Sequence, residues 1–261
     1  MSSILIENVT ILPMDDENKV MEHCDIAIQG NKIVYMGSGS QGPKDFATDT
    51  VIDGGGLLAL PGLVNCHTHA AMTLMRSYAD DLPLMEWLKD KIWPLEAKLE
   101  PEDIYWGTLL CCLEMIKSGT TAFADMYFHM DEVAKAVEKA GMRACLARGL
   151  VGIGPEAELG LEQSENFIRE WHGGADGRIT VMLGPHAPYT CPPDYLKRVA
   201  AIAEKHAVGI HIHIAESKQE IEDIQKDYSK TPVKLLKDCG IFESPVIGAH
   251  CVYVDEKDMA I

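Results

Sequence analysis

Apolar and polar residues alternate in short runs through the first sixty residues, a pattern of period two that is typical of β-strands. The strand-like runs cover residues 3–12, 25–29, 32–36 and 50–53. Gly30 and Asn31 separate the second run from the third and predict a hairpin with a primed turn, because such turns need residues that tolerate positive φ. Residues 1–60 are therefore expected to form a small, sandwich-like β-sheet domain.

From residue 61 onward, apolar runs of strand length alternate with stretches of helical periodicity. The strand-like runs cover residues 62–66, 121–126, 143–150, 179–184, 208–215 and 246–252, and helical patterns cover 101–118, 131–140 and 192–206. Pro101 stands at a first-turn position, and Gly119 and Gly141 follow helix ends, as capping preferences favour. Repeated strand–helix units of this size predict a parallel sheet.

The polar residues of this second region decide between an open sheet and a closed barrel. No GxGxxG motif follows the first strand, so the dinucleotide-binding fingerprint is absent. Polar side chains gather instead at the C-terminal ends of several strands, where (β/α)₈ barrels place their sites. We expect an α/β fold in which residues 61–261 form the first six strands of a (β/α)₈ TIM-type barrel.

Composition narrows the possible partners. The chain has 261 residues, a formal net charge of -17 and eight cysteines without a CxxC pair. An acidic chain is a poor ligand for the nucleic-acid backbone, so no nucleic-acid partner is expected. The sequence has no long apolar run, so no membrane span is expected. It has no basic leader, so no secretory signal is expected. Buried, reduced thiols in a cytoplasmic protein are expected.

Two histidine pairs stand at predicted strand ends. His67 and His69 close the first barrel strand, and residues two apart face the same side, so both imidazoles can reach one ion. His211 and His213 form the second pair; His213 lies nearer the strand end and is the better third ligand, whereas His211 is expected to lie deeper in the core. Glu216 follows, where a carboxylate reaches substrate without binding the metal; a helix-start acid is the alternative.

Two further histidines close other strands, His186 the fourth and His250 the sixth. Such features at successive strand ends point to a catalytic metal site, in which zinc keeps three protein ligands and an open position for water.

The segments PGLVNCHTHAAMTLMR, GTTAFADMYFH, GPHAPYTC, HIHIAES and GAHCVYV together resemble the metal-dependent amidohydrolase superfamily, and within it the branch of 5-methylthioadenosine/S-adenosylhomocysteine deaminases. The resemblance implies that His67, His69 and His213 bind one divalent metal, zinc first, with Fe²⁺, Mn²⁺ or Ni²⁺ as alternatives. It implies that Glu216 protonates purine N1 while hydroxide attacks C6, and that His250 orients or activates the water.

The same resemblance implies the substrate contacts. Glu96 would hold the ribose hydroxyls beside Trp87, and Arg148 and His186 would contact the rest of the nucleoside. Simpler interpretations stay open: Trp87 as helix core and Glu96 as a surface acid. Asp125, at the second strand end, is interpreted as structural. The acidic stretch 216–227 is interpreted as a solvated helix face.

The chain departs from this family in where it stops. Members of the family continue with two more strand–helix units and an aspartate on the eighth strand that binds the metal. We therefore expect residues 1–261 to be part of a longer polypeptide and to have little activity alone; a shortened form that closes by forming a homo-oligomer is the alternative. The branch also places a second arginine near residues 160–162, absent here, which favours methylthioadenosine or adenosine over S-adenosylhomocysteine.

The functional expectation is a zinc-dependent hydrolytic deaminase of adenosine-type nucleosides. A triazine- or guanine-type aminohydrolase or chlorohydrolase is the alternative inside the superfamily. The alternative that is not an enzyme is an inactive metal-binding protein.

Overall fold

A computed structural model describes residues 2–15, 19–38 and 46–261, which divide into two compact units, Met1–Gly62 and Leu63–Ile261. In the first unit, a five-stranded sheet has the order β3-β2-β1-β4, with β5 paired to β1. Its strands are β1 (Ser3–Ile11), β2 (Met21–Gln29), β3 (Lys32–Ser38), β4 (Thr50–Asp53) and β5 (Leu58–Ala59). Gly30 has a φ of 61° between β2 and β3, so the predicted hairpin is confirmed.

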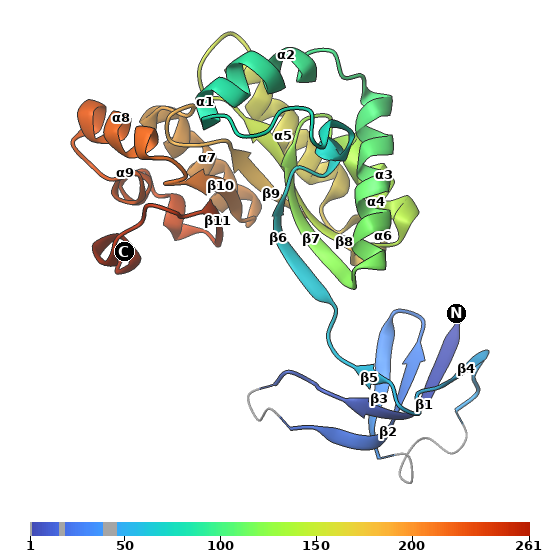
Figure 1. The fold of residues 1–261 in the computed structure, drawn as a ribbon. Helices are drawn as coiled ribbons and strands as arrows, with labels where there is room; N and C mark the ends of the chain where they lie inside the picture. The colour runs from blue at the N-terminus through green and yellow to red at the C-terminus, as the bar shows by residue number, and fades with distance from the viewer. Residues whose placement is uncertain (1, 16–18, 39–45) are drawn as a thin grey trace. The chain divides into compact units, whose positions relative to one another are not determined.

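In the second unit, six parallel strands follow one another in sequence order across the described sheet (Figure 1). They are β6 (Leu63–Thr68), β7 (Thr120–Tyr127), β8 (Arg143–Leu150), β9 (Ile179–Pro185), β10 (Ile210–Ile214) and β11 (Val246–His250). The sheet is strongly curled. Three strands separate β6 from β10, yet a ring nitrogen of His67 on β6 lies 2.8 Å from a ring nitrogen of His211 on β10. The predicted α/β barrel architecture with six strands and the predicted separate small sheet are confirmed.

Helices connect these strands. Those between β6 and β8 are η2 (Ala70–Met75), α1 (Leu84–Glu86), the π-helical η3 (Trp87–Ile92), α2 (Trp93–Glu96), α3 (Pro101–Lys117) and α4 (Met130–Ala140). Those after β8 are α5 (Ala157–Trp171), α6 (Gly174–Gly177), α7 (Pro193–His206), α8 (Lys218–Tyr228), α9 (Pro232–Asp238), η4 (Ile241–Glu243) and α10 (Glu256–Met259). None of the helices in the described ranges has the length and apolarity needed to cross a bilayer.

Local sequence explains the helix ends that the pattern predicts. Helix α3 begins at Pro101 with a reciprocal capping box between Glu100 and Asp103. Helix α4 ends at Gly141, whose φ of 76° is the left-handed conformation that glycine adopts without strain. Burial of the thiols is confirmed for most cysteines, but the expectation is wrong for Cys66, which is exposed on β6.

Helix α3 packs very closely against η2, the turn that follows the first histidine pair. A Cβ atom on Gly107 would lie 2.5 Å from the backbone oxygen of Ala71, a contact that no rotamer change can relieve. Gly107→Ala is therefore expected to lower the free energy of unfolding by about 1–3 kcal/mol, as overpacking does in other proteins. Urea titration measures this quantity.

The matched control adds the same methyl group at an open position. A Cβ atom on Gly174 would meet its nearest neighbour, Trp171, at 3.5 Å, an ordinary contact. Gly174→Ala should shift the unfolding free energy by less than about 1 kcal/mol. Equal unfolding midpoints for the two variants would show that α3 is not tightly seated on η2.

Candidate metal centre and active site

Three imidazoles converge at the C-terminal ends of the barrel strands. His67 lies near the end of β6, His69 directly follows β6, and His213 lies on β10. One ring nitrogen of each lies within 4.8 Å of those of the other two, and the ring centroids are 4.9 to 5.4 Å apart. Strand alternation puts His67 and His69 on one side, because residues two apart point to one side of a strand. The curl of the sheet brings β10, with His213, to them.

The outward nitrogens of these rings are held by hydrogen bonds. His69 Nδ1 lies 2.6 Å from the carbonyl oxygen of Met126 on β7, and His213 Nδ1 lies 2.6 Å from that of His186. A carbonyl oxygen can only accept, so in both rings Nδ1 carries a proton, and Nε2 is the nitrogen left to face an ion. Metal-binding histidines typically donate the N–H of their second ring nitrogen to such an acceptor.

The donor set fits a divalent cation. His67 Nε2 is buried and has no hydrogen-bond partner among the described residues, although its Nδ1 contacts His211. Burial and the neighbouring histidines lower the pKa of His67 to about 3 and that of His213 to about 2, so these rings are neutral at physiological pH. Neutral imidazole is the form that binds metal, and a buried donor without a partner is the feature that an ion would satisfy.

Asp125 on β7 fixes the loop that carries His69. Its Oδ1 accepts from the Thr68 hydroxyl at 2.7 Å and from the Ala70 backbone N–H at 2.6 Å. The carboxyl group is fully buried, and burial raises its pKa. These contacts fit the structural interpretation of Asp125.

Glu216 and His250 lie beside the histidine triad. The ring of His250 is stacked on that of His213 at 5.2 Å, and its Nε2 lies 3.6 Å from Glu216 Oε1. Ala215, which precedes Glu216, and His250 both have positive φ, of 51° and 70°. The backbone that carries the Glu216 and His250 side chains is therefore strained.

The segment after Glu216 differs from the sequence expectation. Glu220 on α8 is only 2 % exposed, and its carboxylate accepts from the backbone N–H groups of Ala215 and Glu216. The interpretation of 216–227 as a solvated helix face is therefore wrong at Glu220. This carboxylate is buried because two otherwise unpaired backbone donors at the strand end need an acceptor.

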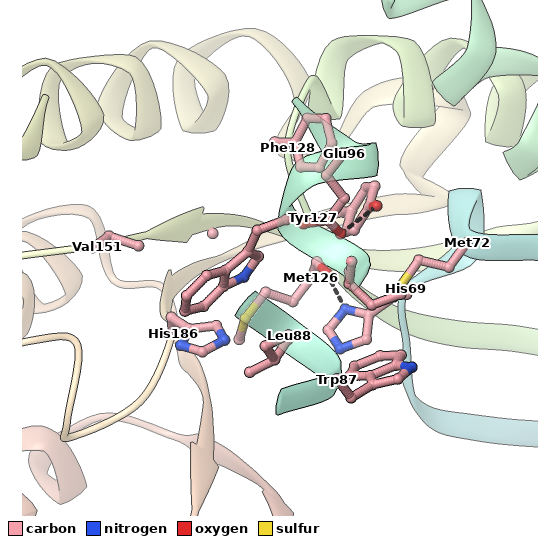
Figure 2. A pocket seen from close by; sticks show the side chains of 13 residues that line it. His69, Met72, Trp87, Leu88, Glu96, Met126, Tyr127, Phe128, Val151 and His186 are labelled. Atoms are coloured by element: carbon pink, nitrogen blue, oxygen red, sulfur yellow. Dashed lines mark hydrogen bonds between the residues drawn. The ribbon is translucent and has the colours of Figure 1, made fainter. Parts of the chain in front are cut away.

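A cavity of about 260 Å³ adjoins the triad (Figure 2). Its walls are mostly apolar and aromatic, and its polar lining includes Glu96, His69 and His186. Trp87 is half-buried, lines the cavity and donates its indole N–H to the Ala79 carbonyl oxygen. Small, mainly apolar cavities with a few fixed polar groups are typical ligand sites.

Glu96 lies in the wall of this cavity rather than on the open surface. Its Oε1 accepts a hydrogen bond of 2.6 Å from the Tyr127 hydroxyl, as Figure 2 shows. Burial raises the pKa of Glu96, and the Tyr127 hydrogen bond opposes that shift. The carboxyl group is therefore placed to accept hydrogen bonds from a ligand.

The two remaining predicted contacts, His186 and Arg148, line different cavities. His186 lines the cavity, and its Nδ1 lies 3.0 Å from the Thr190 hydroxyl. The Arg148 guanidinium instead donates to the Gly149 carbonyl oxygen and to Gln163, and it lines a neighbouring polar cavity. The structure thus brings His186, but not the Arg148 side chain, to the cavity beside the triad.

Sequence reasoning missed the roles of Tyr127 and of two backbone carbonyl groups. Tyr127 stands two residues after Asp125, at the end of the same strand, so strand alternation was the available signal. The carbonyl groups of Met126 and His186 could not be found, because every residue carries one. His211 is fully buried, as expected, but its Nδ1 has no partner in the part of the chain that the structure describes.

Comparison with known proteins places this geometry in a family. The model of the amidohydrolase family matches residues 58–261. The chain is 59% identical over 261 residues to 5-methylthioadenosine/S-adenosylhomocysteine deaminase of Pelotomaculum thermopropionicum, and 55% identical to the protein of that name from Desulforamulus reducens. Each match covers the whole chain but 60% of the relative, so the chain spans about three-fifths of these relatives' length.

Solved structures agree. A zinc-bound adenosine deaminase from Xanthomonas campestris superimposes with a TM-score of 0.92 at 30% identity, over 99% of this chain and 60% of that one. Atrazine chlorohydrolase from Arthrobacter aurescens, complexed with zinc, gives 0.88 at 25% identity, over 98% of this chain and 62% of that one. The matched family is metal-dependent, and the histidine triad could hold a metal. With its barrel strands and strand-end histidines inside the matched region, this chain belongs to the amidohydrolase family.

Proposed function

We propose that this chain carries the catalytic part of a metal-dependent hydrolytic deaminase of adenosine-type nucleosides. Its substrates are 5-methylthioadenosine, S-adenosylhomocysteine or adenosine, and its products are ammonia and the inosine-type nucleoside. The observation that carries the proposal is the histidine triad beside a cavity that also holds an aromatic wall and the carboxyl group of Glu96. The names of the similar deaminases support the same reaction.

His67, His69 and His213 would hold the metal, and zinc is the first candidate. A divalent ion there supplies Lewis acidity and a water nucleophile that is competent at neutral pH. The chain's own contribution is geometric. The carbonyl groups of Met126 and His186 hold two of the rings, so the donor atoms are positioned before any ion arrives.

Glu216 and His250 handle the protons in this proposal. Glu216 transfers a proton to N1 of the purine ring as a water oxygen bonds to C6. The water loses two protons in all: one returns to Glu216 and the other goes to the amino group. The C6–N bond then breaks, the amino group leaves as ammonia, and the carbonyl oxygen of the product comes from water. His250, with Nε2 3.6 Å from Glu216 Oε1, orients the attacking water.

Glu96, Trp87 and His186 select the substrate. The Glu96 carboxylate accepts from the ribose hydroxyls, Trp87 forms an aromatic wall, and His186 offers a ring nitrogen to the nucleoside. Arg148 donates to the Gly149 carbonyl oxygen near the end of β8 and lines the neighbouring cavity. It stays a candidate for contact with a substrate tail.

The proposal is tested with the product of the complete gene. Metal content is measured by elemental analysis, and ammonia release is measured with adenosine, methylthioadenosine, S-adenosylhomocysteine, guanine and a chlorotriazine. Turnover of the adenosine-type nucleosides supports the proposal. Turnover of guanine or the triazine alone would favour the related aminohydrolase or chlorohydrolase, and metal without any turnover would favour an inactive metal-binding protein.

Glu96 provides the sharpest prediction about substrate class. Glu96→Gln is expected to lower kcat/KM for adenosine by about 10- to 100-fold, chiefly through KM, because hydrogen bonds to a charged group contribute about 1.5–3 kcal/mol. The value for 2′,3′-dideoxyadenosine, which lacks both hydroxyls, should change little. Steady-state kinetics with both nucleosides measure the effect.

The control for this prediction is Glu86→Gln, which makes the same chemical change at the exposed end of α1. It should leave both substrates unaffected. An equal loss for both nucleosides in the Glu96 variant would refute the assignment of Glu96 to the ribose.

A further inference from the structure

Tyr127 and its neighbour Met126, at the end of β7, contact residues of the substrate cavity and of the candidate metal centre, respectively. Tyr127 is the last residue of β7 and is 7 % exposed, and its hydroxyl donates to Glu96 at 2.6 Å. The preceding residue, Met126, accepts the hydrogen bond from His69. Two consecutive residues of β7 therefore hold a candidate metal ligand and the candidate ribose-binding carboxylate.

Glu96 itself lies on a less regular element. It ends α2, a helix of four residues that follows the π-helical η3, and the Tyr127 that holds it is 31 residues further along the chain. Tyr127 belongs to the central sheet, and its ring is stacked on that of Phe128 at 4.2 Å. Strand residues hold functional groups more accurately than residues at the ends of short segments, so the orientation of Glu96 is set from β7.

The hydrogen-bonding capacity of Glu96 leaves room for a diol. A carboxylate has two oxygens and about four acceptor positions. The Tyr127 hydroxyl occupies one position on Oε1 and thereby leaves Oε2 and one further position for two donors. Burial and the charge of Glu96 raise the pKa of Tyr127, so the phenol stays protonated and remains a donor.

We propose that Tyr127 is a positioning residue that orients Glu96 toward the ribose hydroxyls and so contributes to the preference for nucleosides over substrates without a vicinal diol. This inference rests on the proposed deaminase function. It assigns Tyr127 no part in the chemical step.

The test compares adenosine with 2′,3′-dideoxyadenosine in the metal-loaded product of the complete gene. Tyr127→Phe removes only the hydroxyl group and keeps the buried ring. It is expected to lower kcat/KM for adenosine by about 10-fold, mostly through KM, because one charge-assisted hydrogen bond is lost. The value for the dideoxy nucleoside should change by less than about 3-fold, because that substrate gains nothing from an oriented Glu96.

A double-variant cycle separates positioning from general stability. In the Glu96→Gln background, Tyr127→Phe should cause little further loss with adenosine, because the two residues act on one interaction. Tyr195→Phe is the matched control: its hydroxyl is also partly buried, but it donates to the Ala157 carbonyl oxygen and does not line the cavity. It should leave both substrates unchanged. Thermal melting and metal content are recorded for every variant.

Three results would overturn the inference. An equal loss for both nucleosides in Tyr127→Phe would show a purely structural role, and an undiminished effect in the Glu96→Gln background would show that Tyr127 does not act through Glu96. If the wild-type protein deaminates none of adenosine, methylthioadenosine and S-adenosylhomocysteine, the proposed function itself fails and this inference fails with it; if it deaminates only one of the latter two, that substrate and its 2′,3′-dideoxy analogue replace adenosine and dideoxyadenosine in the comparison. Failure of the proposed function is recognised without any variant.

Discussion

His213→Ala is expected to abolish tight metal binding and to lower kcat/KM for deamination by more than about 10³-fold, because Lewis-acid catalysis contributes several kcal/mol and each 1.36 kcal/mol is tenfold in rate. His213 supplies one of the three ring nitrogens that converge, and its ring is fixed through Nδ1 by the His186 carbonyl oxygen. Elemental analysis after dialysis and ammonia release from adenosine measure the two effects.

A readout that does not depend on activity separates metal binding from folding. Zinc at 100 times its Kd should stabilise the wild-type protein by about 2.7 kcal/mol, whereas the variant should show no zinc-dependent increase in Tm. Melting in the presence of a chelator compares the two apo proteins directly. His206→Ala, which removes a histidine that pairs with Glu165 on another surface, is the control and should retain metal. Stoichiometric zinc in His213→Ala would show that the triad is not the metal site.

The sequence predicted the architecture wherever local chemistry determines it. The hairpin around Gly30 and the helix that begins at Pro101 follow from turn and capping preferences, and both are present. The strand-like runs correspond to the six parallel strands because period and length suffice to identify them. What the pattern could not give is the curl of the sheet, which brings His67 and His211 together across 144 residues.

The candidate site was predictable in its ligands but not in their supports. Alternation along a strand placed His67 and His69 on one side, and this needs no tertiary information. The groups that orient these rings are mostly backbone carbonyls, whose role depends on which strands become neighbours. Glu220 shows the converse: a carboxylate in an acidic stretch is buried because the strand end leaves two N–H groups unpaired.

Glu216→Gln is expected to separate proton transfer from metal binding. Glu216 directly follows the residue after β10. The Glu220 carboxylate accepts a hydrogen bond of 2.9 Å from the backbone N–H of Glu216, so the backbone that carries the Glu216 side chain is held in place. Its own carboxyl group is not one of the three donors that converge on the candidate metal position, and it lies on the His250 side of the triad. The amide cannot deliver a proton to N1 as the acid can, although it occupies nearly the same volume.

The loss in kcat should therefore be about 10²–10⁴-fold, the usual contribution of a positioned acid–base group, with little change in KM. Metal content should equal that of the wild-type protein, in contrast to His213→Ala. Glu222→Gln makes the same substitution on the exposed face of α8 and should be silent in both measurements. If Glu216→Gln loses zinc in parallel with activity, the carboxylate supports the metal and is not the proton donor. If it retains full turnover, N1 must receive its proton from another group, for which His250, 3.6 Å from Glu216 Oε1, is a candidate.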